Sequence, residues 1–234
     1  MLAVPAPLVL FDIDGTLIST EGRAGQALAG ALSETFGTSG LVPGYSFSGK
    51  TDPQIVFELM ATAGVSHDRV ERQLPEVFAR YLARLAAALQ PGTVKVLAGV
   101  TEILDGLHSR GAPIGLLTGN IYEGAIVKLR AAGLDHHFPF GAFGSDSADR
   151  NALVAVARRR AREALGGDFL GRRIVIVGDA EADILCARAG GTRAVAVASG
   201  WTPRDTLAML RPDALLDSLA EPGALAAILD GVTS

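Results

Sequence analysis

The fold of this 234-residue chain is best predicted from one segment, Leu8-Val9-Leu10-Phe11-Asp12-Ile13-Asp14-Gly15. Four apolar residues lead directly into two carboxylates and a glycine. A short apolar run that ends in a polar turn is typical of a strand buried on both faces of a parallel sheet. Three further runs, Ile114 to Leu117, Ile174 to Val177 and Ala194 to Ala198, have the same character and also lead into polar or glycine-containing turns.

Helical patterns lie between these runs. Segments 100–107, 153–165 and 184–189 favour helices, and each is followed by glycine. Alternating strands and helices predict an α/β fold, a Rossmann-like doubly wound parallel sheet. Ligands bind such sheets at the carboxyl ends of the strands, which is where Asp12, Thr118 and Asp179 fall.

One segment departs from this alternation. From Ser19 to Gln90 we find only helical periodicity, including an apolar stripe from Val70 to Leu89 with spacings of three and four. We therefore expect an inserted α-helical domain over 19–90, with residues 1–18 and 91–234 forming the core.

The composition limits the possible partners. The chain carries 21 basic and 25 acidic residues, a net charge of −4, so it has no basic excess to hold a nucleic acid. No apolar run approaches the roughly 20 residues that a membrane helix needs. Cys186 is the single cysteine, which favours a reducing compartment. We expect a cytoplasmic protein with no nucleic-acid or membrane partner; its oligomeric state is left open.

Four aspartates are predicted to meet at the carboxyl edge of the sheet. Asp12 and Asp14 are two apart at a strand end, so they point the same way. Asp179 and Asp183 are four apart at a helix start, so they share a face. Several carboxylates cannot ionise together cheaply without a cation, and hard oxygen ligands suit Mg²⁺. The alternative is that each aspartate only caps a helix or turn.

These residue types indicate phosphoryl transfer. An aspartate beside a metal, such as Asp12, can attack phosphorus and form an aspartyl-phosphate. The carboxylate of Asp14 can protonate the leaving oxygen and later activate water. Thr118 supplies a hydroxyl, the backbone amides of Gly119 and Asn120 can hold phosphate oxygens, and one cationic side chain should balance the transferring group.

The segments Phe11 to Leu17, Leu116 to Asn120 and Val177 to Asp183 resemble the first, second and fourth motifs of the haloacid dehalogenase-like hydrolase superfamily. They occur in the family's order, and the resemblance covers essentially the whole chain. It implies an Mg²⁺-dependent phosphatase, similar to phosphoglycolate phosphatases, that acts on a small phosphorylated metabolite. The phosphate ester itself is not identified.

The resemblance also implies residue roles. Asp12 is the nucleophile and Asp14 the general acid and base. Asp12, the backbone carbonyl of Asp14, and Asp179 bind Mg²⁺, and Asp183 supports the metal site. True dehalogenases lack a carboxylate at the position of Asp14, which favours a phosphatase or a phosphomutase. A phosphomutase and a non-catalytic phosphate-binding protein are the alternatives.

The third motif departs from the family pattern, which supplies a lysine. Lys95 and Lys128 are poorly placed for it, so we expect Arg150, at the start of a helix, to provide the positive charge. Arginine can perform this electrostatic role, although its planar fork differs from an ammonium. The fourth motif carries Ala180-Glu181 where relatives often have Thr-Pro.

A polar loop in the helical segment has three interpretations. The helical segment over 19–90 resembles the family's cap domain, which closes over the active site of the catalytic core. Within it, Ser48 to Asp52 resembles the part that faces the substrate, so Lys50 is predicted to pair with a substrate carboxylate or second phosphate. Thr51 or Asp52 could also simply cap the helix that begins at Pro53. Residues 44–51 fit G-x-x-x-x-G-K-T as well, but a phosphate loop should follow a buried strand, and residues 38–43 are short and interrupted by Gly and Pro. A nucleoside triphosphatase is therefore disfavoured.

Overall fold

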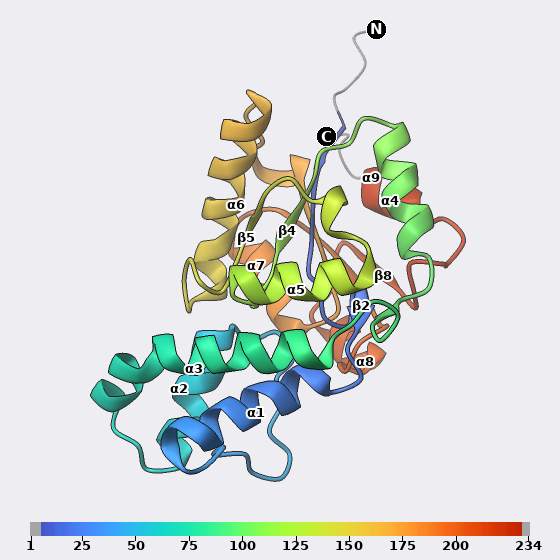
Figure 1. The fold of residues 1–234 in the computed structure, drawn as a ribbon. Coiled ribbons are helices and arrows are strands. Elements are labelled where there is room, and N and C mark those ends of the chain that lie inside the picture. The colour runs from blue at the N-terminus through green and yellow to red at the C-terminus, as the bar shows by residue number, and fades with distance from the viewer. Residues whose placement is uncertain (1–5, 231–234) are drawn as a thin grey trace, which may run out of the picture.

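The computed structural model describes residues 6–230, so the predicted domain limits at residues 1 and 234 lie outside it. A six-stranded sheet with the strand order β5-β4-β1-β6-β7-β8 forms its centre, and all strand pairs are parallel (Figure 1). The strands are β1 (Leu8–Phe11), β4 (Ile114–Leu117), β5 (Gly141–Ala142), β6 (Ile174–Gly178), β7 (Arg193–Val197) and β8 (Ala214–Leu216).

Strand β1 lies at the middle of the sheet, where both of its faces are covered. Val9 and Phe11 belong to the apolar core on one face, and Leu8 and Leu10 to the core on the other. This alternation follows from the two-residue period of a strand, and all four side chains are fully buried. An uninterrupted apolar run is therefore what this strand requires.

Helices cover both faces of the sheet. One face packs against α4 (Val100–Ser109), α5 (Tyr122–Ala132) and α9 (Ala224–Leu229). The other packs against α6 (Arg150–Leu165), α7 (Glu181–Ala189) and α8 (Arg204–Met209). Short 3-10 helices follow α5 and precede β6: η1 (Asp135–His137) packs beside α5, and η2 (Gly171–Arg173) lies beside β7.

The predicted fold class is confirmed, and all four predicted strands are present. The sequence analysis missed β5 and β8 because they contain only two and three residues. Runs this short show neither a clear alternation nor a distinctive composition.

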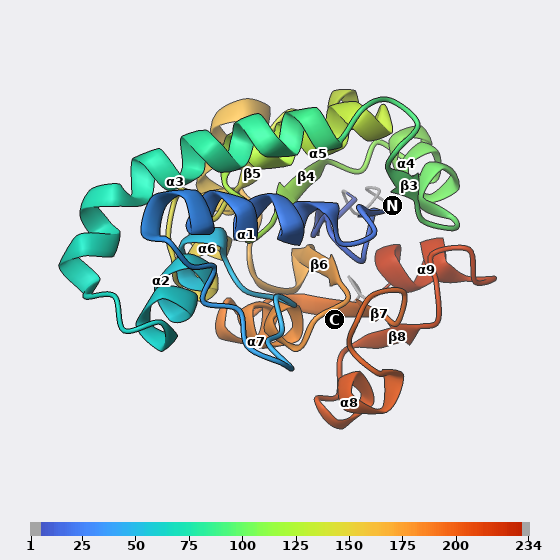
Figure 2. The ribbon, with the colours of Figure 1, turned by 60° about the horizontal axis from the view of Figure 1, so that its bottom comes forward.

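Three helices form a separate layer between β2 (Ile18–Ser19) and β3 (Lys95–Val96), which pair antiparallel. They are α1 (Arg23–Phe36), α2 (Asp52–Thr62) and α3 (His67–Ala88). Helices α1 and α3 run side by side, below the sheet in the view of Figure 1, and Figure 2 shows the same pair after a 60° turn. The division into a core and a cap at residues 18/19 and 90/91 stays a prediction.

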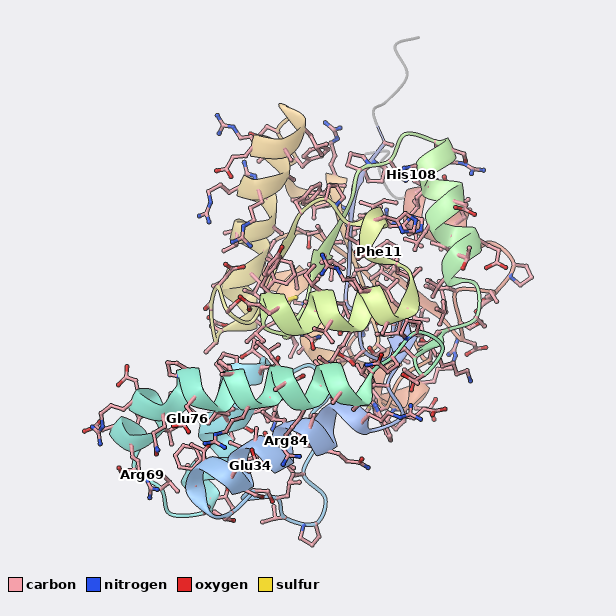
Figure 3. The ribbon with its side chains drawn as sticks, in the orientation of Figure 1. Phe11, Glu34, Arg69, Glu76, Arg84 and His108 are labelled. Atoms are coloured by element: carbon pink, nitrogen blue, oxygen red, sulfur yellow. The ribbon has the colours of Figure 1, made fainter. Side chains whose placement is uncertain are left out.

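Charged side chains join the outer surfaces of α1 and α3. The guanidinium of Arg84 on α3 donates to Glu34 on α1, and Figure 3 shows these two side chains close together between the helices. Arg84 also lies over Gly30, where a Cβ atom would come within 2.7 Å of its Nη1. A glycine at this position of α1 thus leaves room for the guanidinium of Arg84.

The segment before α2 is irregular and follows a helix, not a strand. The Thr51 hydroxyl accepts a hydrogen bond from the Gln54 amide at 3.3 Å, so Thr51 caps α2. The context that a nucleotide phosphate loop needs is therefore missing around residues 44–51. Within residues 6–230, no helix combines the length and apolar character needed to cross a membrane.

Candidate active site

Three aspartates meet at the carboxyl edge of the central strands. Asp12 follows β1 and Asp179 follows β6, and these strands pair in register. Asp183 lies in the first turn of α7, where its carboxylate accepts the Ala180 amide at 3.0 Å. One carboxylate oxygen from each aspartate lies within 4.8 Å of the others, and all three side chains are buried. We call Asp12, Asp179 and Asp183 the acidic cluster.

Two glycines leave room for the carboxylate of Asp179. A Cβ atom at Gly200 would lie 1.7 Å from its Oδ2, and one at Gly15 would lie 2.4 Å away. Gly15 also has a φ of 83°, which a residue with a side chain adopts only with strain. The Thr16 hydroxyl donates to Oδ1 of Asp179 at 3.0 Å. Asp179 is thus fixed in one orientation beside Asp12.

Arg150 faces the acidic cluster from the first residue of α6. It is only 7% exposed; its Nη2 lies 3.3 Å from Oδ1 of Asp12 and also donates to Asp183. Nη1 donates to the carbonyl of Gly49 at 3.3 Å. The structure therefore brings Arg150 to the predicted nucleophile, and its role in catalysis stays a prediction.

The acidic cluster has fewer cationic groups than carboxylates. Burial raises the pKa of Asp12 to about 6; Arg150 opposes this rise, and Asp183 and Asp14 add to it. Burial and then the charges of Asp12 and Asp183 raise the pKa of Asp179 well above its ordinary value. Within residues 6–230, one guanidinium thus faces three buried carboxylates, and a bound cation would relieve their repulsion.

The donor set fits Mg²⁺. All three side chains offer hard carboxylate oxygens, and none offers sulfur or nitrogen, which softer transition metals prefer. The glycine-lined slot around Asp179 leaves its carboxylate close to that of Asp12. The acidic cluster contains three of the four predicted metal ligands. The fourth, Asp14, was predicted to bind through its backbone carbonyl, and its side chain lies elsewhere.

The carboxylate of Asp14 belongs to a second group of polar side chains. Its Oδ2 accepts hydrogen bonds from Nδ2 of Asn120 at 2.9 Å and from Nζ of Lys128 at 2.6 Å. Nδ2 of Asn120 also donates to the Thr118 hydroxyl at 2.8 Å, and Lys128 donates to Oδ1 of Asn120. We call Asp14, Thr118, Asn120 and Lys128 the lysine network. Its single carboxylate is matched by a single ammonium.

Lys128, predicted to be poorly placed for the third-motif charge, pairs with Asp14 in the structure, whereas Arg150 faces Asp12 and Asp183. Lys128 is only 3% exposed and reaches Asp14 from α5, the helix after the second motif. A signal was present in the sequence. Within α5, Lys128 shares the buried face with Gly124, Ala125 and Leu129. A lysine on the apolar face of a helix is rarely buried without a partner.

The predicted substrate-binding residues lie in different surroundings. Gly119 and Asn120 follow β4, and the Asn120 amide donates to the Thr118 hydroxyl at 3.3 Å. Lys50 lies in the loop before α2, where its ammonium pairs with Glu58 and sits 4.2 Å from the centre of the Tyr45 ring. Lys50 therefore already has a carboxylate partner within the chain.

The site at the end of the parallel sheet combines a buried carboxylate at Asp12, a neighbouring carboxylate at Asp14 that solvent reaches, and an acidic cluster with too few cations. These features are typical of a hydrolase site of the phosphoryl-transfer type. The chain matches the haloacid dehalogenase-like hydrolase family over residues 6–191, which is most of its length. It belongs to that family and is an enzyme, a hydrolase.

Named relatives and solved structures agree with this assignment. The chain is 28% identical to a phosphoglycolate phosphatase of Agrobacterium fabrum over 92% of this chain and 90% of the relative. It is 31% identical to a phosphoglycolate phosphatase of Caulobacter vibrioides over 85% and 83%, respectively. The crystal structure of CbbY from Rhodobacter sphaeroides in complex with phosphate has the same fold, with a TM-score of 0.73, 19% identity, and coverage of 95% of this chain and 99% of that one.

Proposed function

We propose that this chain is an Mg²⁺-dependent phosphatase that hydrolyses a small phosphate monoester through an aspartyl-phosphate on Asp12. One observation carries the proposal: the buried carboxylate of Asp12 shares the acidic cluster with Asp179 and Asp183, its Oδ1 lies 3.3 Å from Nη2 of Arg150, and Asp14 follows two residues later in the chain. The named relatives support phosphate-ester chemistry. Mg²⁺ bound by the acidic cluster would supply charge compensation for the transferring phosphoryl group.

In the first half-reaction, a carboxylate oxygen of Asp12 attacks phosphorus and the bond to the leaving oxygen breaks. Asp14 donates the proton that this oxygen needs. Its Oδ2 is occupied by Asn120 and Lys128, and within the described chain its Oδ1 has no hydrogen-bond donor. The side chain is 37% exposed, so Oδ1 is available to the leaving group.

In the second half-reaction, water attacks the phosphorus of the aspartyl-phosphate. Asp14 accepts a proton from that water, the bond between phosphorus and Asp12 breaks, and inorganic phosphate leaves. Arg150 and the Thr118 hydroxyl stabilise the negative charge on the phosphoryl oxygens during both steps. Helices α1–α3, as a cap domain over residues 19–90, would exclude bulk water from the site.

Lys50 is proposed to contact the substrate's leaving group, but its charge is balanced by Glu58. Tyr45 and Gln54 also donate to Glu58, at 3.0 and 2.8 Å. A loop with this balance suits a hydroxylated leaving group better than an additional anion. Phosphoglycolate, sugar phosphates and nucleoside monophosphates all belong in a substrate test. The cytoplasmic location and the absence of a nucleic-acid partner stay predictions.

The decisive experiment measures phosphate release from a panel of monoesters and from ATP, with Mg²⁺ and with EDTA. We expect Mg²⁺-dependent phosphate release from at least one monoester. Asp12→Asn cannot form the aspartyl-phosphate, so its turnover should fall by at least about 10³-fold. Asp168→Asn, an exposed carboxylate paired with Arg158, is the matched control and should keep full turnover.

Other outcomes identify the alternatives. Phosphate transfer between the positions of a sugar phosphate, without net release, would establish a phosphomutase. Binding of phosphate without turnover would establish a non-catalytic protein. ATP hydrolysis that survives in Asp12→Asn would contradict the proposed mechanism.

A further inference from the structure

Asp52, in the first turn of α2, makes two hydrogen bonds to the loop that carries the second motif. Its backbone amide donates to the carbonyl of Gly119 at 2.7 Å. Its Oδ2 accepts the amide of Ile121 at 2.8 Å. Residues 119 and 121 flank Asn120, so a single residue of the helical segment fixes the peptide groups on both sides of Asn120.

The orientation of Asn120 decides whether its side chain can reach its partners. Nδ2 must lie close to Asp14 and to the Thr118 hydroxyl at the same time. The carbonyl of Asn120 is held from the opposite side by the Gly144 amide at 2.7 Å. With Asp52, the backbone around Asn120 is therefore held on both sides, and its side-chain amide is aimed at the carboxylate that exchanges the proton.

Helix capping does not account for the carboxylate of Asp52. Thr51 already caps α2 through its hydroxyl, so Asp52 is not needed for that purpose. Asp52 is only 7% exposed, and burial raises its pKa to about 6, against the opposing charge of Lys128. A buried carboxylate is costly, and that of Asp52 accepts its hydrogen bond from the catalytic loop.

The loop is also shaped to receive this contact. A Cβ atom at Gly119 would lie 2.1 Å from the carbonyl oxygen of Lys50 and 2.9 Å from the Cα of Thr51. Only glycine lets the chain before α2 come this close to the end of β4. The approach places the Asp52 amide within reach of the Gly119 carbonyl.

We propose that Asp52 is a positioning residue for the hydrolytic reaction: it orients Asn120, and through Asn120 the carboxylate of Asp14. This inference rests on the proposed function for its kinetic consequence. Because Asp52 belongs to α2, the packing of α2 on the core and the assembly of the lysine network occur together. A site from which α2 has moved away lacks two of the bonds that orient Asn120.

The test is a double-mutant cycle on the full chain with Asp52→Ala, Asn120→Ala and the combined variant. We expect Asp52→Ala to lower kcat about 10- to 30-fold with little change in KM. Because Asp52 acts through Asn120, the combined variant should be no slower than Asn120→Ala alone. Independent, multiplying effects would overturn the proposal.

Two further substitutions keep the test valid if Asp52→Ala fails to fold. Asp52→Asn retains an oxygen that can accept the Ile121 amide and should recover kcat to within about 3-fold of the parent chain. Asp52→Glu keeps the charge but moves the oxygens by one methylene, and it should lose kcat as Asp52→Ala does. Full turnover in Asp52→Glu would contradict the proposed geometry.

Thr51→Val is the matched control for a purely structural role. The Thr51 hydroxyl also joins α2 to the core, by donating to the Ala148 carbonyl at 2.9 Å, and within residues 6–230 it makes no hydrogen bond to Gly119 or Ile121. Its effect on kcat should multiply with that of Asn120→Ala. If Thr51→Val shows the same coupling as Asp52→Ala, Asp52 acts only by seating α2, and the proposal is wrong.

Amide hydrogen exchange separates this inference from the proposed function. The Ile121 amide should be protected in the parent chain and in Asp52→Asn, and should exchange at least about 10-fold faster in Asp52→Ala and Asp52→Glu. This measurement needs no substrate. A parent chain that hydrolyses no monoester would defeat the proposed function, whereas unchanged exchange of Ile121 would defeat the role of Asp52.

Discussion

The acidic cluster and the lysine network, the two sides of the site, differ in charge balance. On one side, the acidic cluster has three buried carboxylates for one guanidinium, and the pKa values of Asp12 and Asp179 are raised. On the other side, the lysine network matches the carboxylate of Asp14 with the ammonium of Lys128. This difference indicates where a metal ion belongs: the acidic cluster has more buried carboxylates than cations, whereas Asp14 already pairs with an ammonium.

The same contrast assigns the chemistry. A deficit of positive charge suits the place where a metal ion and a dianionic phosphoryl group bind together. A carboxylate whose Oδ2 is held by hydrogen bonds has a fixed orientation, which suits the exchange of a proton through its other oxygen. Of the following four experiments, three alter one side and leave the other intact, and the fourth alters the loop before α2.

The largest effect is expected from removing the cation of the acidic cluster. Arg150→Met leaves the three carboxylates without a guanidinium and should lower kcat/KM by about 10³-fold. Arg150→Lys should restore part of this loss, because an ammonium supplies charge but not the second donor to Gly49. Steady-state kinetics at saturating Mg²⁺ provides the measurement.

Arg158→Met, on the exposed side of the same helix, is the control for Arg150. It should keep the activity of the parent chain. Equal activities of Arg150→Met and the parent chain, with circular dichroism showing both folded, would remove Arg150 from the site.

On the balanced side, Lys128→Met should lower kcat by about 10²-fold and leave Mg²⁺ affinity within about 2-fold of the parent value. The ammonium holds Oδ2 of Asp14, and its loss leaves a carboxylate without its main partner. Lys95→Met removes an exposed lysine from β3 and serves as the comparison. A large loss of Mg²⁺ affinity in Lys128→Met would show that the two sides are not separate.

Metal binding should stabilise the fold through the acidic cluster alone. At Mg²⁺ concentrations about 100 times Kd, the folded state gains about 2.7 kcal/mol, which for a chain of this size raises Tm by roughly 5–10 °C. Calorimetry should show this shift in the parent chain and in Lys128→Met. Asp179→Asn should lose most of it, and an undiminished shift there would place the metal elsewhere.

The smallest effect concerns the loop before α2, outside both sides of the site. Glu58→Gln removes the carboxylate that balances Lys50, so the ammonium becomes available to an anionic leaving group. We expect kcat/KM for phosphoglycolate to rise about 3- to 5-fold relative to that for a neutral sugar phosphate. Reversal of this ratio would show that Lys50 does not face the leaving group.

The sequence predicted much of the fold because the strands are long enough to be seen. The runs ending at Phe11, Leu117 and Val177 are four-residue apolar stretches at the centre of the sheet, where both faces are buried. Strand β5 escaped because two residues at a sheet edge need not be apolar or alternate. The helices predicted over 100–107, 153–165 and 184–189 are present, with ends that differ from the prediction by up to three residues.

The candidate site was predicted unevenly for a related reason. Asp12, Thr118 and Asp179 each follow a visible strand, so strand order alone brings them to one edge. Lys128 and Asp52 lie on helices, and their approach to the site depends on how those helices pack. The interpretation of Asp52 as a possible helix cap was consistent with its sequence position but did not reveal its bonds to Gly119 and Ile121.

By itself, the sequence determined a parallel α/β sheet, an inserted helical segment and carboxylates gathered at the strand ends, because each depends on local periodicity and on chain order. Tertiary structure alone decided how the charges pair. Arg150 pairs with Asp12 and Asp183, Lys128 pairs with Asp14, and Glu58 pairs with Lys50. Ion pairs between distant segments are set by the packing of helices on the sheet, and helix packing leaves no periodic signal in the residues that pair.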